Sequence, residues 1–123
     1  MGGSAAASLF ARYARLADDH DYEGWSDLFC PDALFAFGSE EVRGREEIRQ
    51  WLADRFGALT AFHSIVNVHA VPETADRMAV SADFAFHRRE GASWVLAMVG
   101  RYEDVVVRDD GVWRFLEHRI VVR

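Results

Sequence analysis

The second half of the chain is built from long stretches of β-branched and aromatic residues, and this pattern limits the fold more than any other feature. Four such stretches follow one another, separated by short turns that contain proline, glycine or aspartate. The turn Asp109-Asp110-Gly111 is typical of a β-hairpin, so we expect neighbouring strands to pair in antiparallel fashion. The expected strands cover residues 60–71, 78–87, 94–108 and 112–122.

The first half of the chain shows helical spacing instead. Apolar residues recur every three or four positions through residues 9–20, with charged residues opposite, which predicts an amphipathic helix. Asp21 suits the N-cap of a second short helix carrying Trp25, Leu28 and Phe29. Helices followed by long strands make an α+β domain, and a curved sheet would leave a cavity beside the helices. The remaining expected elements are a strand over residues 33–37, a turn or hairpin over 38–44 and a third helix over 45–56.

Length and composition fit a single domain. The chain has 123 residues, of which 50% are hydrophobic, and single domains cluster at roughly 100–150 residues. We expect residues 1–8 to be a flexible N-terminal segment and residues 9–123 to form the α+β domain.

Charge and hydropathy exclude several classes of partner. The net charge of −6 disfavours nucleic acid, which requires a basic surface. No apolar run approaches the roughly 18 residues that suggest a membrane span, and the start does not resemble a secretory signal. The single cysteine, Cys30, excludes an internal disulfide. We therefore expect a cytoplasmic protein without a membrane partner.

Five segments, taken in order, resemble the SnoaL-like branch of the nuclear transport factor 2-like superfamily. They are YARLADDHDYEGWSDLFCPDALF, GREEI, FHSIVNV, GRYEDVVVR and DGVWRF, and they span nearly all of the chain from Leu9 to Val122. The resemblance implies a conical barrel, in which three N-terminal helices close a strongly bent, mainly antiparallel sheet, and a homodimer. That superfamily includes dehydratases, ketosteroid isomerases, epoxide hydrolases, polyketide cyclases and members that only bind ligands, so function must be argued from the site.

Tyr13, Asp18 and His63 form the leading candidate site. Their spacing resembles the tyrosine–aspartate–histidine set of bile-acid dehydratases. The last two also resemble residues of scytalone dehydratase, whose neighbouring tyrosine is replaced here by Ala17. A neutral imidazole can remove a proton beside a carbonyl, and a carboxylate can orient that imidazole. A buried tyrosine hydroxyl can donate a hydrogen bond to the developing enolate oxygen.

The geometry of this set depends on local detail. On an ideal helix Tyr13 and Asp18 point about 140° apart, so they converge only if the helix loosens near Asp18. Strand alternation puts His63, Asn67 and His69 on one face if no bulge intervenes. No cysteine or carboxylate lies at ligand spacing beside the two histidines, so we expect neither a metal nor another cofactor. The residues expected to contact the substrate are Asn67, Phe37, Tyr102 and Trp25.

One departure from the relatives argues against steroid isomerisation. In an alignment through the shared motifs, Tyr13 falls where ketosteroid isomerases have their oxyanion-hole tyrosine. Their general-base aspartate falls at Phe37, which cannot accept a proton. The tyrosine without that base favours either His63 as the base or no catalysis at all.

A second polar set is Arg101, Glu103 and Glu117. It resembles the Asp–Arg–Asp arrangement of limonene epoxide hydrolase, although both acids are glutamates here. A cross-strand ladder of ion pairs on the solvated sheet face is the simpler interpretation. Tyr102 and Asp104 lie on the other face of that strand and could pair with Arg119 or line the cavity.

These patterns predict a dehydratase or isomerase that acts beside a carbonyl of a small cyclic or polyketide-like substrate. Non-catalytic binding of a small apolar ligand is the first alternative, and an epoxide hydrolase or cyclase is the second. Apolar residues alternate on both faces of the expected sheet, and one face suffices to line the cavity. We therefore expect a homodimer through the outer sheet face.

Overall fold

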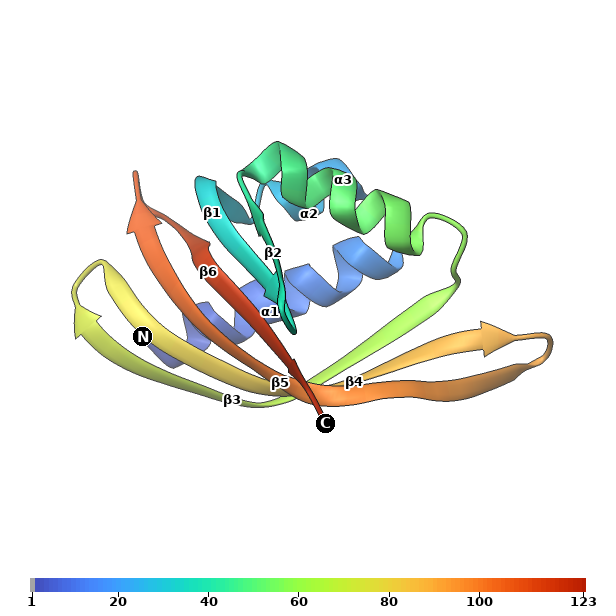
Figure 1. The fold of residues 1–123 in the computed structure, drawn as a ribbon. Helices are drawn as coiled ribbons and strands as arrows, with labels where there is room; N and C mark the ends of the chain where they lie inside the picture. Colours follow the sequence, from blue (N-terminus) through green and yellow to red (C-terminus); the bar gives the residue numbers. More distant parts are fainter. Residues whose placement is uncertain (1) are drawn as a thin grey trace.

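Three helices lie on one side of a single six-stranded sheet in the computed structural model, which describes residues 2–123 (Figure 1). Met1 lies outside the described residues. The elements follow the order that the sequence predicts, so the α+β class is confirmed. They are α1 (Gly2–Asp18), α2 (Tyr22–Ser26), β1 (Phe29–Phe37), β2 (Glu40–Arg43), α3 (Arg45–Phe56), β3 (Ala61–Thr74), β4 (Arg77–Glu90), β5 (Ser93–Asp109) and β6 (Val112–Val122).

The sheet is mainly antiparallel, as expected, but it is not a closed barrel. The strand order is β2-β1-β6-β5-β4-β3, so β2 and β3 are free edges, and only β1 and β6 pair in parallel. The expectation of a closed conical barrel is therefore wrong. The helices explain the difference, because α1 packs against β3 while α3 packs against β1 and β2, and these contacts cover the open side (Figure 1).

Helix α1 begins well before the expected position. Residues 2–8, which we expected to be flexible, are helical, and Ala6 is buried. The segment is rich in alanine, the residue with the highest helix propensity, and it continues the apolar stripe of Leu9 and Phe10. No helix among residues 2–123 is both long and apolar enough to cross a membrane.

Helix α2 is shorter than predicted. Asp21 caps it as expected, since its carboxylate accepts a hydrogen bond of 2.9 Å from the backbone N–H of Gly24. The helix then ends at Ser26, and Phe29 already belongs to β1. The reason lies in the sheet, because Phe29 pairs with Phe115 of β6. Tertiary pairing therefore overrides the local helical pattern.

The β-hairpin predicted at Asp109-Asp110-Gly111 is confirmed, since it joins β5 to β6. Asp110 and Gly111 both have positive φ angles, of 52° and 77°, as a tight turn between twisted strands requires. This hairpin pairs residues 100–109, the C-terminal half of β5, with residues 112–122 of β6. An aromatic core fills the space between this sheet region and the helices. Its least exposed members include Phe10, Trp25, Phe29, Phe35, Tyr102 and Phe115.

Candidate active site

Asp18 and His63 are joined by two hydrogen bonds. One carboxylate oxygen of Asp18 lies 2.6 Å from Nδ1 of His63, and the other accepts the backbone N–H of His63 at 3.0 Å. Both side chains are largely buried, with exposures of 13% and 9%. Asp18 is the last residue of α1, and His20 ends the helix in the left-handed conformation. The two contacts therefore fasten the end of α1 to the start of β3.

These bonds set the tautomer of His63. An ionised carboxylate can only accept hydrogen bonds, so Nδ1 carries the ring hydrogen and Nε2 has the free lone pair. Nε2 takes part in no hydrogen bond among residues 2–123. The ring also lies edge-on to Tyr13, with ring centroids 6.0 Å apart. His63 is thus held in the form that a general base requires.

Tyr13 and Asp18 reach the same place without any loosening of the helix. α1 stays helical through Asp18, which contradicts the condition inferred from the helical wheel. The imidazole of His63 lies between the two, because it contacts the carboxylate on one side and the phenol ring on the other. Tyr13 and Asp18 thus both contact His63 of β3, although the helix itself does not bring the two side chains together.

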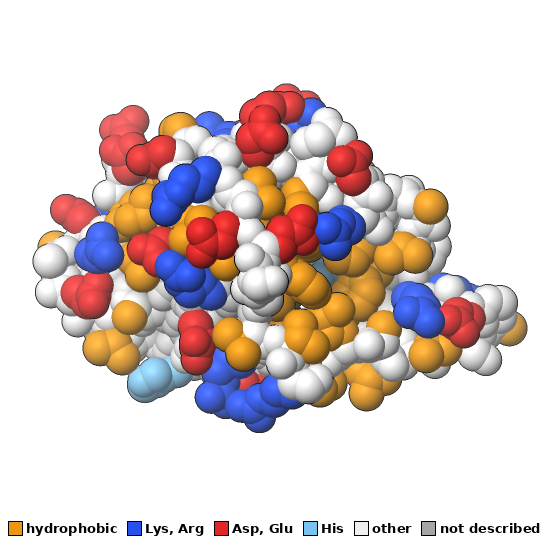
Figure 2. Space-filling view, viewed as in Figure 1, with side chains coloured by type: hydrophobic (Ala, Val, Ile, Leu, Met, Phe, Trp, Pro, Cys, Tyr) orange, Lys and Arg blue, Asp and Glu red, His pale blue; other side chains and the backbone are white. Residues whose placement is uncertain are grey.

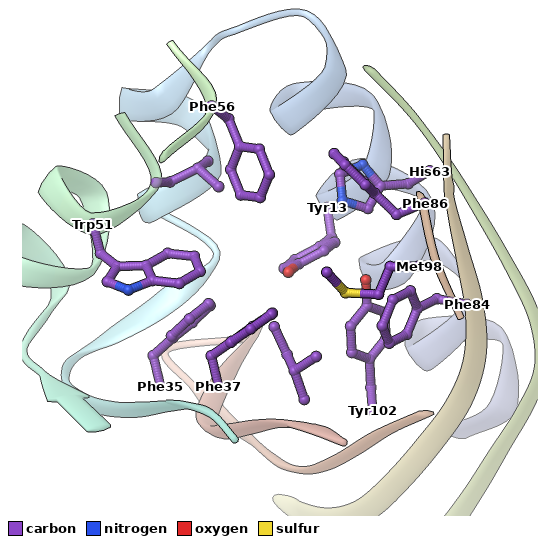
Figure 3. A pocket seen from close by; sticks show the side chains of 12 residues that line it. Tyr13, Phe35, Phe37, Trp51, Phe56, His63, Phe84, Phe86, Met98 and Tyr102 are labelled. Carbon is purple, nitrogen blue, oxygen red and sulfur yellow. The ribbon is translucent and has the colours of Figure 1, made fainter. Parts of the chain in front are cut away.

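A mainly aromatic cavity lies beside this pair, between α3 and the strands. Figure 2 shows the corresponding hydrophobic hollow between α3 and the β4–β5 hairpin, and Figure 3 shows the Tyr13 hydroxyl pointing into the cavity. The cavity leaves about 30 Å³ for the centres of water-sized molecules, which is enough for water or a small group. A ring-sized ligand would require the side chains at the mouth to move. The wall consists of Tyr13, Phe35, Phe37, Trp51, Leu52, Phe56, His63, Phe84, Phe86, Met98, Tyr102 and Ile120.

Two of the four residues expected to contact the substrate line the cavity. Phe37 and Tyr102 belong to its wall. Trp25 does not, because it is fully buried behind Tyr13, with ring centroids 5.6 Å apart. Asn67 does not either, since it is exposed and donates a hydrogen bond of 2.9 Å to Asp83.

A bulge in β3 explains the position of Asn67. Val66 pairs with Asp83, but the next pair is His69 with Ser81, and Asn67 has a φ of 55°. The extra residue moves Asn67 and His69 off the face that carries His63. The condition for a shared face, a strand without a bulge, is therefore not met.

Tyr13 contacts a second buried polar pair that the sequence did not predict. Its hydroxyl oxygen lies 3.0 Å from Nε2 of His118, and Nδ1 of His118 lies 2.7 Å from an oxygen of Asp104. The other oxygen of Asp104 accepts the backbone N–H of Arg119 at 3.0 Å. The side chain of Arg119 thus does not pair with Asp104, and Asp104 lies behind the cavity wall rather than in it.

A bulge in β6 hid this pair from sequence reasoning. Val106 pairs with Phe115, so regular pairing would place Asp104 opposite Glu117. The bulge shifts the register by one residue and places Asp104 opposite His118 instead. The available signal was weak: a histidine and an acid on adjacent strands of a hairpin, each between apolar residues at alternate positions.

Burial controls the charge of the polar groups around Tyr13. It raises the pKa of Tyr13 and of Tyr102 well above their usual range, so both phenols stay protonated. It also raises the pKa of Asp104, against the opposing influence of His118. The cavity therefore presents neutral phenols beside the imidazole of His63.

The second polar set, Arg101, Glu103 and Glu117, does not reach the cavity. Arg101 pairs with Asp83 at 2.7 Å, Glu117 pairs with Arg119 at 3.0 Å, and Glu103 is exposed. None of these side chains belongs to the cavity wall. The arrangement expected of an epoxide hydrolase is thus not assembled. Among residues 2–123, no three His, Cys, Asp or Glu side chains gather as a metal site.

Comparison with known proteins places the chain among similar sequences and folds. Residues 4–119 match the SnoaL-like domain. No curated protein matches the chain. A single-site variant of Rv3472, a Mycobacterium tuberculosis protein of unknown function, is 23% identical with a TM-score of 0.89, covering 94% of this chain and 68% of its own.

Two further solved structures share the fold. A Novosphingobium aromaticivorans protein, named provisionally as a scytalone dehydratase, is 19% identical with a TM-score of 0.86, covering 98% of this chain and 83% of its own. ActVI-ORFA from Streptomyces coelicolor is 14% identical with a TM-score of 0.87, covering 97% of this chain and 95% of its own. At these identities the likeness establishes the fold alone.

Proposed function

Because the chain belongs to the family of SnoaL-like domains, we propose that it is a dehydratase or isomerase that removes a proton beside a carbonyl. Its substrate is a small cyclic or polyketide-like molecule, and the reaction requires no cofactor. His63 is the base, Asp18 orients it, and Tyr13 donates a hydrogen bond to the carbonyl oxygen.

One observation carries this proposal. The ring of His63 is fixed through Nδ1 by Asp18 at 2.6 Å, while the ring itself forms part of the cavity wall beside Tyr13. A free Nε2 lone pair on a ring that lines an apolar cavity is suited to accept a proton from carbon. The adjacent carboxylate stabilises the imidazolium that results.

The chemistry follows from these positions. Nε2 of His63 takes the proton from the carbon next to the carbonyl, and the C–H electrons move to the carbonyl oxygen as an enolate. Tyr13 stabilises that oxygen with its hydrogen bond. In dehydration the enolate re-forms the carbonyl and expels the β-hydroxyl, which takes the proton from His63 and leaves as water. In isomerisation His63 returns the proton to another carbon.

The cavity wall supports a small, flat and largely apolar substrate. Aromatic residues from β1, α3 and β4 make up half of its lining residues, and Figure 3 shows them arranged around a central space. Phe37, Phe56 and Met98 are only partly buried, so these side chains are the ones that would move to admit a ring. The scytalone dehydratase name of one structural relative fits dehydration at the level of the fold.

Non-catalytic ligand binding is the second candidate. It is favoured by the small cavity of about 30 Å³ and by a wall in which His63 is the one imidazole and no carboxylate is present. In that case His63 and Asp18 would be a structural fastening of α1 to β3.

Exchange of hydrogen for deuterium separates these candidates without knowledge of the natural substrate. Small cyclic ketones and hydroxy-ketones are incubated with the protein in heavy water, and exchange beside the carbonyl is followed by NMR. The proposal expects catalysed exchange that His63→Ala abolishes and His69→Ala, an exposed position on the same strand, does not. Saturable ligand binding without exchange at any pH would instead identify a binding protein.

A further inference from the structure

A buried polar chain runs from the β5–β6 hairpin to the cavity, and the steps assigned to His63 do not explain it. Tyr13 lies 3.0 Å from Nε2 of His118, and Nδ1 of His118 lies 2.7 Å from Asp104. The side chains of His118 and Asp104 have no exposure at all, 0% for each. This series of hydrogen-bonded side chains ends at the cavity, because the Tyr13 hydroxyl points into the cavity (Figure 3).

The direction of the Tyr13–His118 hydrogen bond depends on the protons held by the Asp104–His118 pair. If the pair has a net charge of about −1, an ionised Asp104 accepts from Nδ1, and Nε2 accepts the hydrogen of Tyr13. If the pair is neutral overall, it is either a carboxylate with an imidazolium or a carboxylic acid with a neutral imidazole. In both neutral forms Nε2 carries a hydrogen and donates it to Tyr13.

The packing around His118 favours the neutral forms. The rings of Phe29, Phe35 and Phe115 lie 5.9, 5.4 and 5.2 Å from its ring, measured between centroids. An uncompensated charge in such apolar surroundings is costly. A net negative charge would therefore need a cation nearby.

The charged groups nearby do not supply that cation. Asp18 on α1 and Glu103 on β5 are themselves acidic, and both disfavour a further negative charge here. Arg119 on β6 contributes its backbone N–H to Asp104, while its guanidinium pairs with Glu117. Burial correspondingly raises the pKa of Asp104.

The other titratable neighbours of Tyr13 leave this polarity unchanged. Tyr102 meets Tyr13 ring to ring, with centroids 5.5 Å apart, and burial raises the pKa of Tyr102, so its phenol stays protonated. His63 meets Tyr13 only through its ring edge, and Asp18 holds its Nδ1. The Tyr13 oxygen thus accepts from His118, and its own hydrogen is left for the cavity.

We propose that Asp104 and His118 are positioning residues that turn the Tyr13 hydroxyl hydrogen into the cavity. This end of the cavity consequently selects ligands with an acceptor oxygen, such as a carbonyl or enolate, over ligands that offer only a hydroxyl donor. The inference rests on the proposed function for the use of that oxygen, but the polarity of the site can be measured without turnover.

The first test reads the hydrogen on His118 in the free protein. Nitrogen NMR of protein labelled in its histidines distinguishes a protonated from an unprotonated ring nitrogen, and the His118 signals are those that vanish in Asp104→Asn/His118→Phe. The proposal expects a hydrogen on Nε2 at neutral pH. An Nε2 without a hydrogen, beside an Nδ1 that has one, overturns it.

The second test measures the carbonyl of a bound ligand. Infrared spectra of 2-cyclopenten-1-one at saturating concentration should show a C=O band moved to lower frequency, and Tyr13→Phe should lose that shift. Asp104→Asn should keep it, because the amide can accept from Arg119 and donate to Nδ1, which leaves the hydrogen on Nε2. Absence of the shift in the wild-type protein overturns the proposed ligand class.

Asp104→Asn gives different outcomes for the two hydrogen-bond directions, because its amide places a hydrogen on Nε2 of His118 in either case. If Nε2 already donates to Tyr13 in the wild-type protein, the carbonyl shift stays the same in the variant. If Nε2 instead accepts the hydrogen of Tyr13 in the wild-type protein, the variant frees that hydrogen and the shift increases. Asp104→Asn/His118→Phe differs from this variant only at His118, leaves no buried carboxylate without its partner, and should have a smaller shift because Tyr13 loses a donor.

These readouts separate this inference from the proposed function. His63→Ala should leave the Nε2 hydrogen of His118 and the carbonyl shift unchanged while removing hydrogen exchange at carbon. A protein with both polarity signals but no exchange would disprove the function and keep the inference. A protein that catalyses hydrogen exchange but has no hydrogen on Nε2 of His118 would disprove the inference and keep the function.

Discussion

Both carboxylate oxygens of Asp18 are used by a single residue, His63, which lies 45 positions along the chain. One oxygen holds the ring and the other holds the backbone N–H of the same residue. The ring therefore cannot turn about its own strand without breaking a contact to α1. This fixed geometry supports the proposed role of His63 as a base, and it leads to the first two predictions.

His63→Ala should lower the rate of turnover or of hydrogen exchange by roughly 10²–10⁴-fold, the usual contribution of a general base. Steady-state kinetics or the NMR exchange assay measures this loss. His69→Ala is the control, since His69 is exposed on the same strand, and equal losses in the two variants would contradict the assignment.

Asp18→Asn should reduce the rate less than His63→Ala but clearly. The amide has one acceptor oxygen, so it cannot satisfy both the ring Nδ1 and the backbone N–H of His63, and it carries no charge to stabilise an imidazolium. Kinetics of this variant should be compared with Asp19→Asn at the exposed neighbouring position. An Asp18→Asn rate equal to wild type would show that the carboxylate has no part in the chemistry.

Tyr13→Phe should lower kcat by about 10²–10³-fold and change KM little, as expected on removal of a hydrogen bond that strengthens in the transition state. The ring itself stays, so its contacts with Trp25 and Phe115 are retained. Thermal unfolding checks that the variant is folded. A large rise in KM at constant kcat would mean that Tyr13 only binds the substrate.

The two fully buried tyrosines, Tyr13 and Tyr102, should ionise only as the protein unfolds in alkali. Burial raises the pKa of Tyr13, Tyr22 and Tyr102 above the ordinary value of about 10. Above about pH 10 the unfolded chain loses phenolic protons that the folded chain keeps, so the free energy of unfolding falls as the pH rises. Phenolate absorbance and circular dichroism should change together. Ionisation of Tyr13 and Tyr102 with the helical signal intact would contradict this prediction.

The outer sheet face should mediate a homodimer. Phe62, Leu96 and Val121 are 54%, 58% and 46% exposed, which is unusual for large apolar side chains. Sedimentation at micromolar concentration should give twice the chain mass of 13.9 kDa, and Leu96→Glu should shift the equilibrium toward monomer. Ser93→Glu, at an exposed polar position on the same strand, serves as the control. A wild-type protein that sediments only as a monomer would refute the dimer.

Much of the fold followed from local patterns in the sequence. The helical stripe of Leu9, Phe10 and Tyr13 and the turn at Asp110-Gly111 each determine structure through neighbours in the chain. The helix over residues 2–8 was missed, although alanines, which have the highest helix propensity, lie directly before Leu9. The sheet was predicted to form a conical barrel, but it is open at β2 and β3. Whether a sheet closes depends on how the helices pack between its edge strands, which local sequence patterns do not show.

The candidate site was less predictable, because two bulges determine it. One bulge moves Asn67 out to solvent, and the other brings His118 opposite Asp104. A bulge reverses which side chains face inward, yet it leaves little trace in a pattern of alternating residues. The resemblance to known families led to Asp18 and His63, whereas nothing in the spacing pointed to His118.

The bulge at Asn67 also bears on how the protein avoids aggregation. β3 is a free edge of 14 residues, and a flat edge of that length is a template on which a strand of another molecule can add. The left-handed Asn67 breaks its row of N–H and C=O groups near the middle, and Pro72 removes a donor farther along. A chain without Asn67 would extend that row, while Val68 and Ala70 would still face the core. The residue that disturbs the regular strand thus helps to keep separate molecules from joining into fibres.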